Sequence, residues 1–322
     1  MSVAERIRID DRLNGGGGDG DLAAEVREGL TRPLKELPPK LFYDATGSDL
    51  FDAITELPEY YPTRCEREIL ERRAGDILDA AATDELVELG SGSATKTRVL
   101  LATGLLRRYV PVDVSHTAVA RSAEELTGMH PELHVHGLIG DFHRDLVHLP
   151  GGGRRLFAFL GGTIGNFHPA ERVEFLAMLR ELMGPDDRLL LGTDLVKDAE
   201  TLEAAYNDSR GVTAEFNRNA LRVVNRELDA DFPPERFEHV AFYNEDDAWI
   251  EMRLRSLDER TVEVRGAGLS VELAAGEDIR TEISAKFTPE RVEDDLAAAG
   301  LGLDELWTDS GGRFALSLSS PA

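Results

Sequence analysis

The chain of 322 residues is strongly acidic: 61 aspartates and glutamates oppose 36 lysines and arginines, which gives a net charge of −25 at pH 7. A surface of this charge repels phosphate backbones and anionic lipid headgroups, so we expect neither nucleic acid nor a membrane as a partner. The hydrophobic content of 42% is sufficient for a sizeable core. No apolar run approaches the roughly 20 residues that a membrane span requires.

The first 20 residues are polar and include four consecutive glycines, Gly15–Gly18. We therefore expect a disordered tail over residues 1–20 rather than a secretory signal. Cys65 is the only cysteine, which excludes an internal disulfide and argues against a cysteine-based zinc site. The spacings of the eight histidines fit no metal-site pattern, so we expect no metal. These features favour a cytoplasmic protein.

Between residues 84 and 195, apolar β-type runs alternate with helical patterns. This order is typical of a doubly wound α/β fold, in which a parallel sheet is connected by crossover helices. The expected strands are Glu85–Leu89, Tyr109–Asp113, Leu133–Ile139, Leu156–Leu160 and Arg188–Thr193.

The pattern changes after Leu195, where two helices precede short strands typical of antiparallel pairing. A helix and two further strands follow residue 286 and would complete the far edge of the first sheet. We therefore expect an insertion at residues 197–285, which joins residues 21–64 in a second, α+β domain. Residues 65–196 and 286–322 would form the doubly wound, Rossmann-like domain.

A strand, a Gly-x-Gly turn and a helix start follow one another in ELVELGSGSATKT, Glu85–Thr97. Gly90 and Gly92 allow a sharp turn and the close approach of a ligand. Ligands of open α/β sheets bind at the carboxyl ends of strands, where this turn lies. The spacing matches neither the dinucleotide fingerprint, which would require glycine at Thr95, nor a P-loop. The alternative is an ordinary tight turn without a ligand.

Acidic residues follow the next two expected strands. Asp113 ends the second strand, where a carboxylate can accept hydrogen bonds from ribose hydroxyls. Its alternative role is to cap the next helix. Asp141 and Phe142 follow the third strand and could bind the amino group and the ring of adenine. Together, the three elements predict a cofactor that contains adenosine.

The character of the glycine turn favours S-adenosylmethionine over a nicotinamide cofactor. A nicotinamide enzyme normally carries the longer glycine fingerprint, which holds a pyrophosphate at the helix N-terminus. Here the helix start at Ser93–Lys96 is looser and suits an amino-acid tail. Lys96 could bind the carboxylate of that tail; the alternative is an exposed lysine on a helix.

Six longer strings are more specific than these general elements. They are LPPKLFYDATGSDLFDAIT at Leu37–Thr55, LPEYYPTR at Leu57–Arg64, LGGTIGNF at Leu160–Phe167, LLLGTDLVKD at Leu189–Asp198, GVTAEFNRN at Gly211–Asn219 and TEISAKF at Thr281–Phe287. In these strings the chain resembles the histidine Nα-methyltransferases of ergothioneine biosynthesis, over about 300 residues. That family trimethylates the α-amino group of L-histidine to hercynine with S-adenosylmethionine.

The resemblance implies two sets of binding residues and a two-domain methyltransferase, which we expect to act as a monomer on a small molecule. The cofactor residues would be Tyr43, Gly90, Lys96, Asp113, Asp141 and Phe142. The histidine-binding residues would be Tyr60, Gly161, Asn166, Tyr206, Met252, Glu282 and Ser284.

The expected catalytic residues are Asn166, Tyr60 and Tyr206. The Asn166 amide oxygen could accept from the substrate amine and orient its lone pair; the alternative is a turn asparagine. Tyr60 and Tyr206 could bind the carboxylate or the amine, although a lone tyrosine more often packs in a core. No dedicated base is evident, and a tyrosine or a bound water is the best candidate.

Glu282 and Ser284 are two residues apart, so their side chains would face the same side of an extended segment. A carboxylate beside a hydroxyl suits the two nitrogens of an imidazole, and the alternative is a solvated strand face. Met252 would point inward, as core or as a pocket wall. Two other functions stay open: methylation of another amino acid such as a tryptophan derivative, and cofactor sensing without catalysis.

Overall fold

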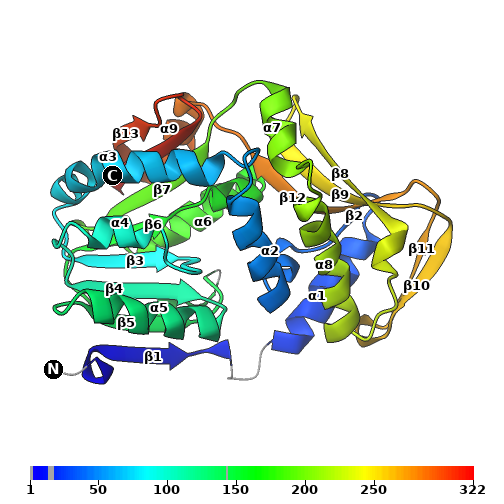
Figure 1. Ribbon diagram of the computed structural model, residues 1–322, viewed down its shortest axis with the longest axis horizontal. Coiled ribbons are helices and arrows are strands. Elements are labelled where there is room, and N and C mark those ends of the chain that lie inside the picture. The colour runs from blue at the N-terminus through cyan, green and yellow to red at the C-terminus, as the bar shows by residue number, and fades with distance from the viewer. Residues whose placement is uncertain (1–2, 14–17, 143) are drawn as a thin grey trace. The chain divides into compact units, whose positions relative to one another are not determined.

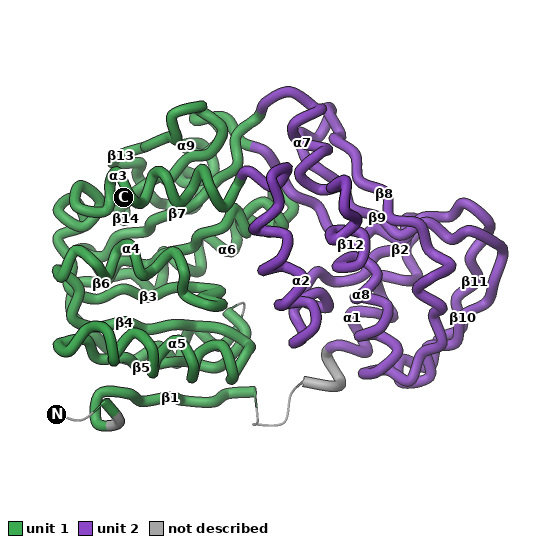
Figure 2. Tube along the Cα trace, viewed as in Figure 1, with its two compact units in different colours: residues 1–16, 62–196, 287–322 green, residues 17–61, 197–286 purple. Residues whose placement is uncertain are grey.

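The computed structural model describes residues 3–13, 18–142 and 144–322 of the chain. It divides into two compact units, each assembled from separate segments (Figure 2). Unit 1 comprises residues 1–16, 62–196 and 287–322, and unit 2 comprises residues 17–61 and 197–286. The sequence analysis placed the corresponding boundaries after residues 64 and 285, so the observed boundaries differ by three residues and one residue.

Unit 1 is built on one eight-stranded sheet (Figure 1). Its neighbouring strands pair in parallel from β1 to β7, and β14 and β13 add antiparallel pairs at the far edge. In spatial order the strands are β1 (Ile7–Asp11), β5 (His134–Ile139), β4 (Arg108–Asp113), β3 (Glu85–Leu89), β6 (Arg155–Phe159), β7 (Arg188–Asp194), β14 (Phe314–Pro321) and β13 (Leu301–Thr308).

The order of these strands reverses at β3. From β3 the chain proceeds through β4 to β5 on one side, and then returns to β6 and β7 on the other. In open sheets of this kind, ligands bind beyond the carboxyl ends of the strands at the reversal. The expected doubly wound sheet is confirmed, and its reversal point coincides with the strand that enters the glycine turn.

The helices of unit 1 pack their apolar stripes against the sheet and against one another, α3 with α4 and α6 with α9. In α3, residues such as Ile69, Ile77 and Leu78 are buried at helical spacing. The helices are α3 (Pro62–Ala81), α4 (Thr97–Leu101), α5 (His116–Met129), α6 (Pro169–Leu182) and α9 (Pro289–Ala298).

The expected disordered tail over residues 1–20 is wrong in two places: residues 18–20 begin a helix, and Ile7–Asp11 form a strand. This strand is β1 at the sheet edge, where Ile7 pairs with Val135 and Ile9 with Gly137. The Arg6 guanidinium fixes this strand by donating to the Thr127 and Leu133 carbonyls at 2.8 and 2.9 Å. Pairing with a preformed neighbour stabilises a strand too short to be recognised alone. Residues 14–17, which include most of the Gly15–Gly18 run, lie outside the described residues.

Unit 2 combines helices with a four-stranded sheet and a separate hairpin (Figure 1). The face of the sheet that carries Met252 and Leu254 packs against α8. In chain order the elements are α1 (Gly18–Thr31), β2 (Lys35–Glu36), α2 (Ala45–Thr55), α7 (Ala199–Tyr206), α8 (Val212–Glu227), β8 (Phe237–Asn244), β9 (Trp249–Ser256), β10 (Arg260–Val264), β11 (Leu269–Leu273) and β12 (Asp278–Ala285). The sheet order is β2-β12-β9-β8.

Across the part of the chain that the structure describes, no helix combines the length and the apolarity needed to traverse a bilayer.

Candidate active site

The glycine turn of unit 1 follows β3 and depends on backbone conformations that favour glycine. Gly90 and Gly92 have φ of +69° and +48°, in the left-handed region. The Gly90 N–H donates to the Val112 carbonyl at 2.8 Å, which ties the turn to the end of β4. A Cβ on Gly92 would meet nothing within 4 Å. The turn therefore presents a bare backbone beside open space.

Asp113 binds this turn directly. Its carboxylate accepts the Gly92 N–H at 2.8 Å with one oxygen and the Ser115 N–H at 2.9 Å with the other. The alternative role as the cap of the next helix is wrong, because Ser115 is the N-cap of α5 and accepts the Ala118 N–H at 3.2 Å. Burial raises the pKa of Asp113. Each carboxylate oxygen has a further lone pair with which to accept a hydroxyl.

Asp141 and Phe142 follow β5 and lie at the same end of the sheet. The Asp141 N–H donates to the Asp145 carboxylate at 2.8 Å, which fixes the turn after β5. The Phe142 ring packs edge-on against Phe159, with the ring centroids 5.5 Å apart. A Cβ on Gly90 would lie 4.0 Å from the Phe142 ring. The three expected cofactor elements are thus neighbours.

The expected cofactor residue Lys96 is held by Glu66, a residue of α3 that the sequence analysis missed. The two side chains form an ion pair of 2.6 Å, and Glu66 is fully buried. The second Glu66 oxygen accepts the Gly161 N–H at 2.7 Å. Glu66 therefore joins the N-terminal part of α3 to two expected site residues, one for the cofactor and one for histidine.

The remaining expected residue of unit 1, Asn166, ends the short helix Thr163–Asn166 that follows β6. It is half-buried. Gly161 and Gly162 precede this helix with φ of +83° and +71°, so the chain leaves β6 in a tight turn that glycine permits. Asn166 thus lies in the loop after β6, which pairs with β3 on the side opposite β4.

A second buried carboxylate, Glu88, supports the glycine turn from within β3. It accepts hydrogen bonds from the hydroxyls of Thr97 and Tyr109, the latter at 2.5 Å. Burial raises the pKa of Glu88 to about 7. The bond to Thr97 connects β3 to the first residue of α4, so the turn is closed at both ends.

In unit 2, Tyr43, Tyr60 and Tyr206 belong to one aromatic cluster. Phe51 contacts both Tyr43 and Tyr60, with ring centroids 6.0 and 6.2 Å away, and Tyr60 contacts Tyr206 at 6.2 Å. All the pairs are edge-on. Tyr43 is the most exposed of them, with 38% of its surface accessible, while Tyr60 is buried. The structure thus brings together three expected residues that are distant in sequence.

Glu282 and Ser284 face the same side of β12, as expected, and a β-bulge determines which side. Before the bulge, Arg280 pairs with Arg253 of β9, whereas after it Glu282 pairs with Met252. Directly opposed residues of antiparallel strands share a face, and consecutive residues do not. The extra residue, Thr281, therefore transfers Glu282 and Ser284 to the face of Met252, which is itself buried.

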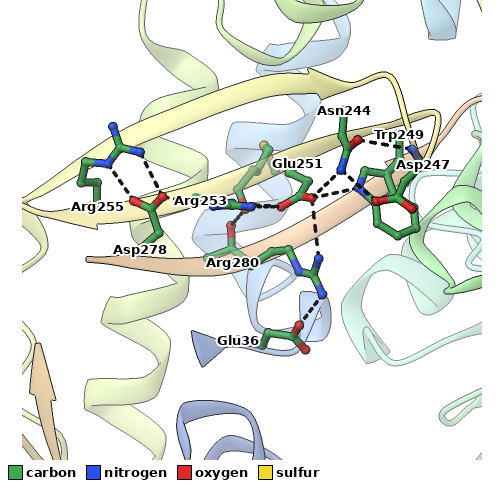
Figure 3. Close-up of polar contacts among 11 residues, drawn as sticks. Glu36, Asn244, Asp247, Trp249, Glu251, Arg253, Arg255, Asp278 and Arg280 are labelled. Atoms are coloured by element: carbon green, nitrogen blue, oxygen red, sulfur yellow. Dashed lines mark hydrogen bonds and ion pairs between the residues drawn. The ribbon is translucent and has the colours of Figure 1, made fainter. Parts of the chain in front are cut away.

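The opposite face of the same sheet carries an ionic network (Figure 3). Glu251 is buried and accepts from the Trp249 indole at 3.0 Å and from Arg253 at 2.6 Å. Burial acts to raise the pKa of Glu251, but these hydrogen bonds hold it below its usual value. Arg280 lies 3.7 Å from Glu251 and also pairs with Glu36 on β2. Arg280 and Glu282 thus serve different faces, although they stand two residues apart.

A buried chain of hydrogen bonds connects the bulge to Tyr206. The Thr281 hydroxyl lies 2.7 Å from Asn217 Oδ1, and Asn217 Nδ2 lies 2.9 Å from His239 Nδ1. His239 Nε2 donates to the Tyr206 carbonyl at 2.9 Å. This set of partners requires the neutral ring with its proton on Nε2. Neither Asn217 nor His239 was expected from the sequence.

Comparison with known families decides the relationship of the chain. Residues 22–321 match the family described as histidine-specific methyltransferase, SAM-dependent. The chain belongs to this family.

Two curated relatives of this methyltransferase are named histidine N-alpha-methyltransferase. The protein of Mycolicibacterium smegmatis is 54% identical, over 92% of this chain and 94% of its own length. That of Mycobacterium tuberculosis is 48% identical, over 98% and 99% of the two chains. Ergothioneine biosynthesis protein 1 of Neurospora crassa is 30% identical over 88% of this chain, which matches 33% of the fungal protein.

Proposed function

We propose that this methyltransferase trimethylates the α-amino group of L-histidine with S-adenosylmethionine to give hercynine, the first step of ergothioneine biosynthesis. Membership of the histidine-specific family supports the reaction. The observation in the structure that carries the choice of substrate is the placement of Glu282 and Ser284 together on the Met252 face of β12.

The residues of unit 1 fit S-adenosylmethionine. The turn at Gly90 carries no side chain and would let the backbone contact the cofactor. The Asp113 carboxylate, which binds this turn, would accept from the ribose hydroxyls. The Phe142 ring, 4.0 Å from a Cβ on Gly90, would contact the adenine. Lys96 and Gly161 share Glu66 as a partner. Lys96 retains ammonium donors for the amino-acid tail. We also assign Tyr43, a residue of unit 2, to the cofactor. When bound, this co-substrate supplies an electrophilic methyl group on a sulfonium.

The amine of histidine must be unprotonated to attack a methyl carbon. We assign Asn166 to accept a hydrogen bond from the amine, Tyr60 to bind the carboxylate or receive the amine proton, and Tyr206 to bind the carboxylate. Positioning by these side chains and by Gly161 would supply most of the rate, because the reaction needs neither a covalent intermediate nor a metal.

The imidazole would be recognised by Glu282 and Ser284. A carboxylate accepts the ring N–H, and a hydroxyl donates to the other nitrogen. Met252 lies on the same face and offers an apolar surface to the ring. The runner-up is a tryptophan derivative, but an indole has one N–H and no second ring nitrogen, so it would offer the Ser284 hydroxyl no acceptor nitrogen.

Mass spectrometry tests this proposal without prior choice of substrate. The full chain is incubated with S-adenosylmethionine and each of the twenty amino acids in turn. We expect histidine alone to gain one, two and three methyl masses. Methylation of tryptophan instead of histidine would establish the runner-up, and no methylated amino acid would contradict an amino-acid methyltransferase altogether.

The proposal further takes the enzyme to be a cytoplasmic monomer that requires neither metal nor nucleic acid. The net charge of −25 disfavours nucleic acid. In the part of the chain that is described, no cluster of three or more His, Cys, Asp or Glu side chains is arranged to hold a metal ion. Full activity after dialysis against EDTA, and elution as a single chain in gel filtration, are the expected results.

A further inference from the structure

Lys286 follows β12 directly and contacts two residues of the proposed histidine site. It is fully buried. Its ammonium donates to the Ser284 hydroxyl at 2.8 Å and to the Tyr206 hydroxyl at 3.1 Å, and it lies 4.7 Å from the centroid of the Tyr206 ring. The two hydroxyls are themselves 2.7 Å apart. The three groups, all in unit 2, form a closed triangle of hydrogen bonds.

The chemistry of the three groups limits how protons are arranged in this triangle. An ammonium only donates, so each hydroxyl oxygen uses a lone pair to accept from Lys286. The contact between Tyr206 and Ser284 consumes one of the two hydroxyl protons. One hydroxyl proton therefore remains, and it is directed to an acceptor outside the triangle.

Without the ammonium, this restriction is lost. Tyr206 and Ser284 could each rotate their hydroxyl protons freely between donation and acceptance, and either oxygen could accept from a substrate N–H. With the ammonium in place, the lone pairs are largely occupied and a positive charge lies within hydrogen-bonding distance of both oxygens. The pair then favours a partner that accepts a hydrogen bond and carries negative charge or a lone pair.

We propose that Lys286 is a positioning residue. It orients the hydroxyl groups of Tyr206 and Ser284 so that the pair donates a hydrogen bond to an acceptor atom of the amino-acid substrate. This inference rests on the proposed function, because that function assigns both hydroxyls to histidine. The substrate has two acceptors of this kind, a carboxylate oxygen and the unprotonated imidazole nitrogen. Lys286 does not touch the reacting atoms; it acts through the two hydroxyls.

Calorimetric titration of the full chain with L-histidine, in the presence of S-adenosylhomocysteine, tests the role of Lys286. Lys286→Met keeps an unbranched side chain, shorter by one atom, and removes the charge. We expect its affinity for L-histidine to fall by about tenfold or more, since a hydrogen bond to a charged group is lost. Its affinity for S-adenosylhomocysteine should stay within about twofold of the unmodified chain. Lys286→Arg should recover part of the loss.

Lys197 offers a matched control. It also donates to a tyrosine hydroxyl, that of Tyr61 at 2.7 Å, and lies 4.5 Å from the centroid of that ring. Lys197→Met should bind L-histidine like the unmodified chain. An equal loss in both variants would overturn the proposal, because it would attribute the effect to packing around a tyrosine.

A double-mutant comparison separates hydroxyl orientation from structural damage. In the Tyr206→Phe and Ser284→Ala background, Lys286→Met should change histidine affinity by no more than about twofold, because no hydroxyl remains to orient. A further tenfold loss there would refute the proposed mode of action. If the unmodified chain itself fails to bind L-histidine, the proposed function fails, which is a different result.

Histamine distinguishes the two acceptors, since it lacks the carboxylate and keeps the imidazole. If the triangle donates to imidazole, Lys286→Met should weaken histamine, measured by competition, by the same factor as histidine. If it donates to the carboxylate, histamine should bind both chains equally. Equal binding of L-histidine to both chains, with either result for histamine, would overturn the proposal.

Discussion

The Glu66 carboxylate and the Lys96 ammonium, 2.6 Å apart, form an ion pair in which the carboxylate is fully buried. Glu66 reaches Lys96 from α3 and binds the Gly161 N–H with its other oxygen. A residue that was expected to touch neither the cofactor nor histidine thus positions Lys96, an expected cofactor residue, and Gly161, an expected histidine-binding residue.

We expect Glu66→Ala to weaken S-adenosylmethionine binding by about tenfold or more, because a buried ion pair loses one partner and Gly161 loses its acceptor. Glu66→Gln retains an acceptor for Gly161, so its affinity for the cofactor should fall between those of the unmodified chain and Glu66→Ala. Calorimetric titration with the cofactor measures the three affinities. Glu71 lies on the same helix and is exposed, so Glu71→Ala serves as the control. Unchanged binding in Glu66→Ala would contradict this role.

Glu282→Ala should weaken histidine binding far more than cofactor binding. The variant removes the carboxylate proposed to accept the imidazole N–H, a charge-assisted hydrogen bond. The loss should reach at least about tenfold in the dissociation constant for L-histidine. Glu272→Ala removes an exposed carboxylate from β11 of the same unit and should bind histidine normally. An unaltered histidine affinity in Glu282→Ala would rule out this assignment.

His239 should make stability depend on pH in the mildly acidic range. Burial lowers its pKa from the usual value of 6.5. The unfolded chain therefore binds a proton near pH 6.5 that the folded chain resists, so the free energy of unfolding falls as pH drops below about 6.5. Above that range both states are neutral and this contribution is constant.

His239→Gln should flatten that part of the profile, as measured by urea unfolding between pH 7.5 and 5.5. His134 is exposed, and His134→Gln should leave the slope as it is. A slope equal to that of the unmodified chain in His239→Gln would show that other groups cause the dependence. The variant should also raise the KM for histidine, because His239 fixes the Tyr206 carbonyl.

Glu88 should make stability depend on pH in the opposite direction to His239, with stability falling as pH rises. Burial raises its pKa to about 7 from 4.5, so its contribution to stability is complete below about pH 4.5 and is lost as pH rises through 7. Glu88→Gln cannot ionise and still accepts from Thr97 and Tyr109. We expect its melting temperature to decline less than that of the unmodified chain between pH 5 and 8. An equal decline of the melting temperature in the two proteins would contradict this role of Glu88. Glu132→Gln, at an exposed position, is the control.

The sequence predicted the central strands of the unit 1 sheet well, because apolar runs alternate there with helical patterns and β3, β4 and β5 each end in a turn with a chemical signature. Gly90, Asp113 and Phe142 were recognisable at strand ends, and the structure brings them together. Ile7–Asp11 was missed, since five residues carry too little periodicity and gain their stability from β5.

The supporting residues were harder to predict. Glu66 does carry a signal: it falls among Cys65, Ile69 and Leu70 in the buried stripe of α3, where a charge demands a partner. The partner itself, Lys96, is distant in sequence. Lys286 continues the two-residue spacing of Glu282 and Ser284, but the triangle requires Tyr206 from another element. Tertiary contacts of this kind have no local pattern.

The bulge at Thr281 has a consequence for how sequences of related enzymes are compared. A relative that lacks this one residue would restore strict alternation along β12 and would still hold its glutamate and serine opposite Met252, because Arg280 and Glu282 would become consecutive residues on opposite faces. A relative of the same length whose strand paired without the bulge would instead turn both residues towards the arginines. Retention of the glutamate and the serine is therefore not sufficient to identify a histidine pocket, since the register of this strand against β9 determines which face they occupy.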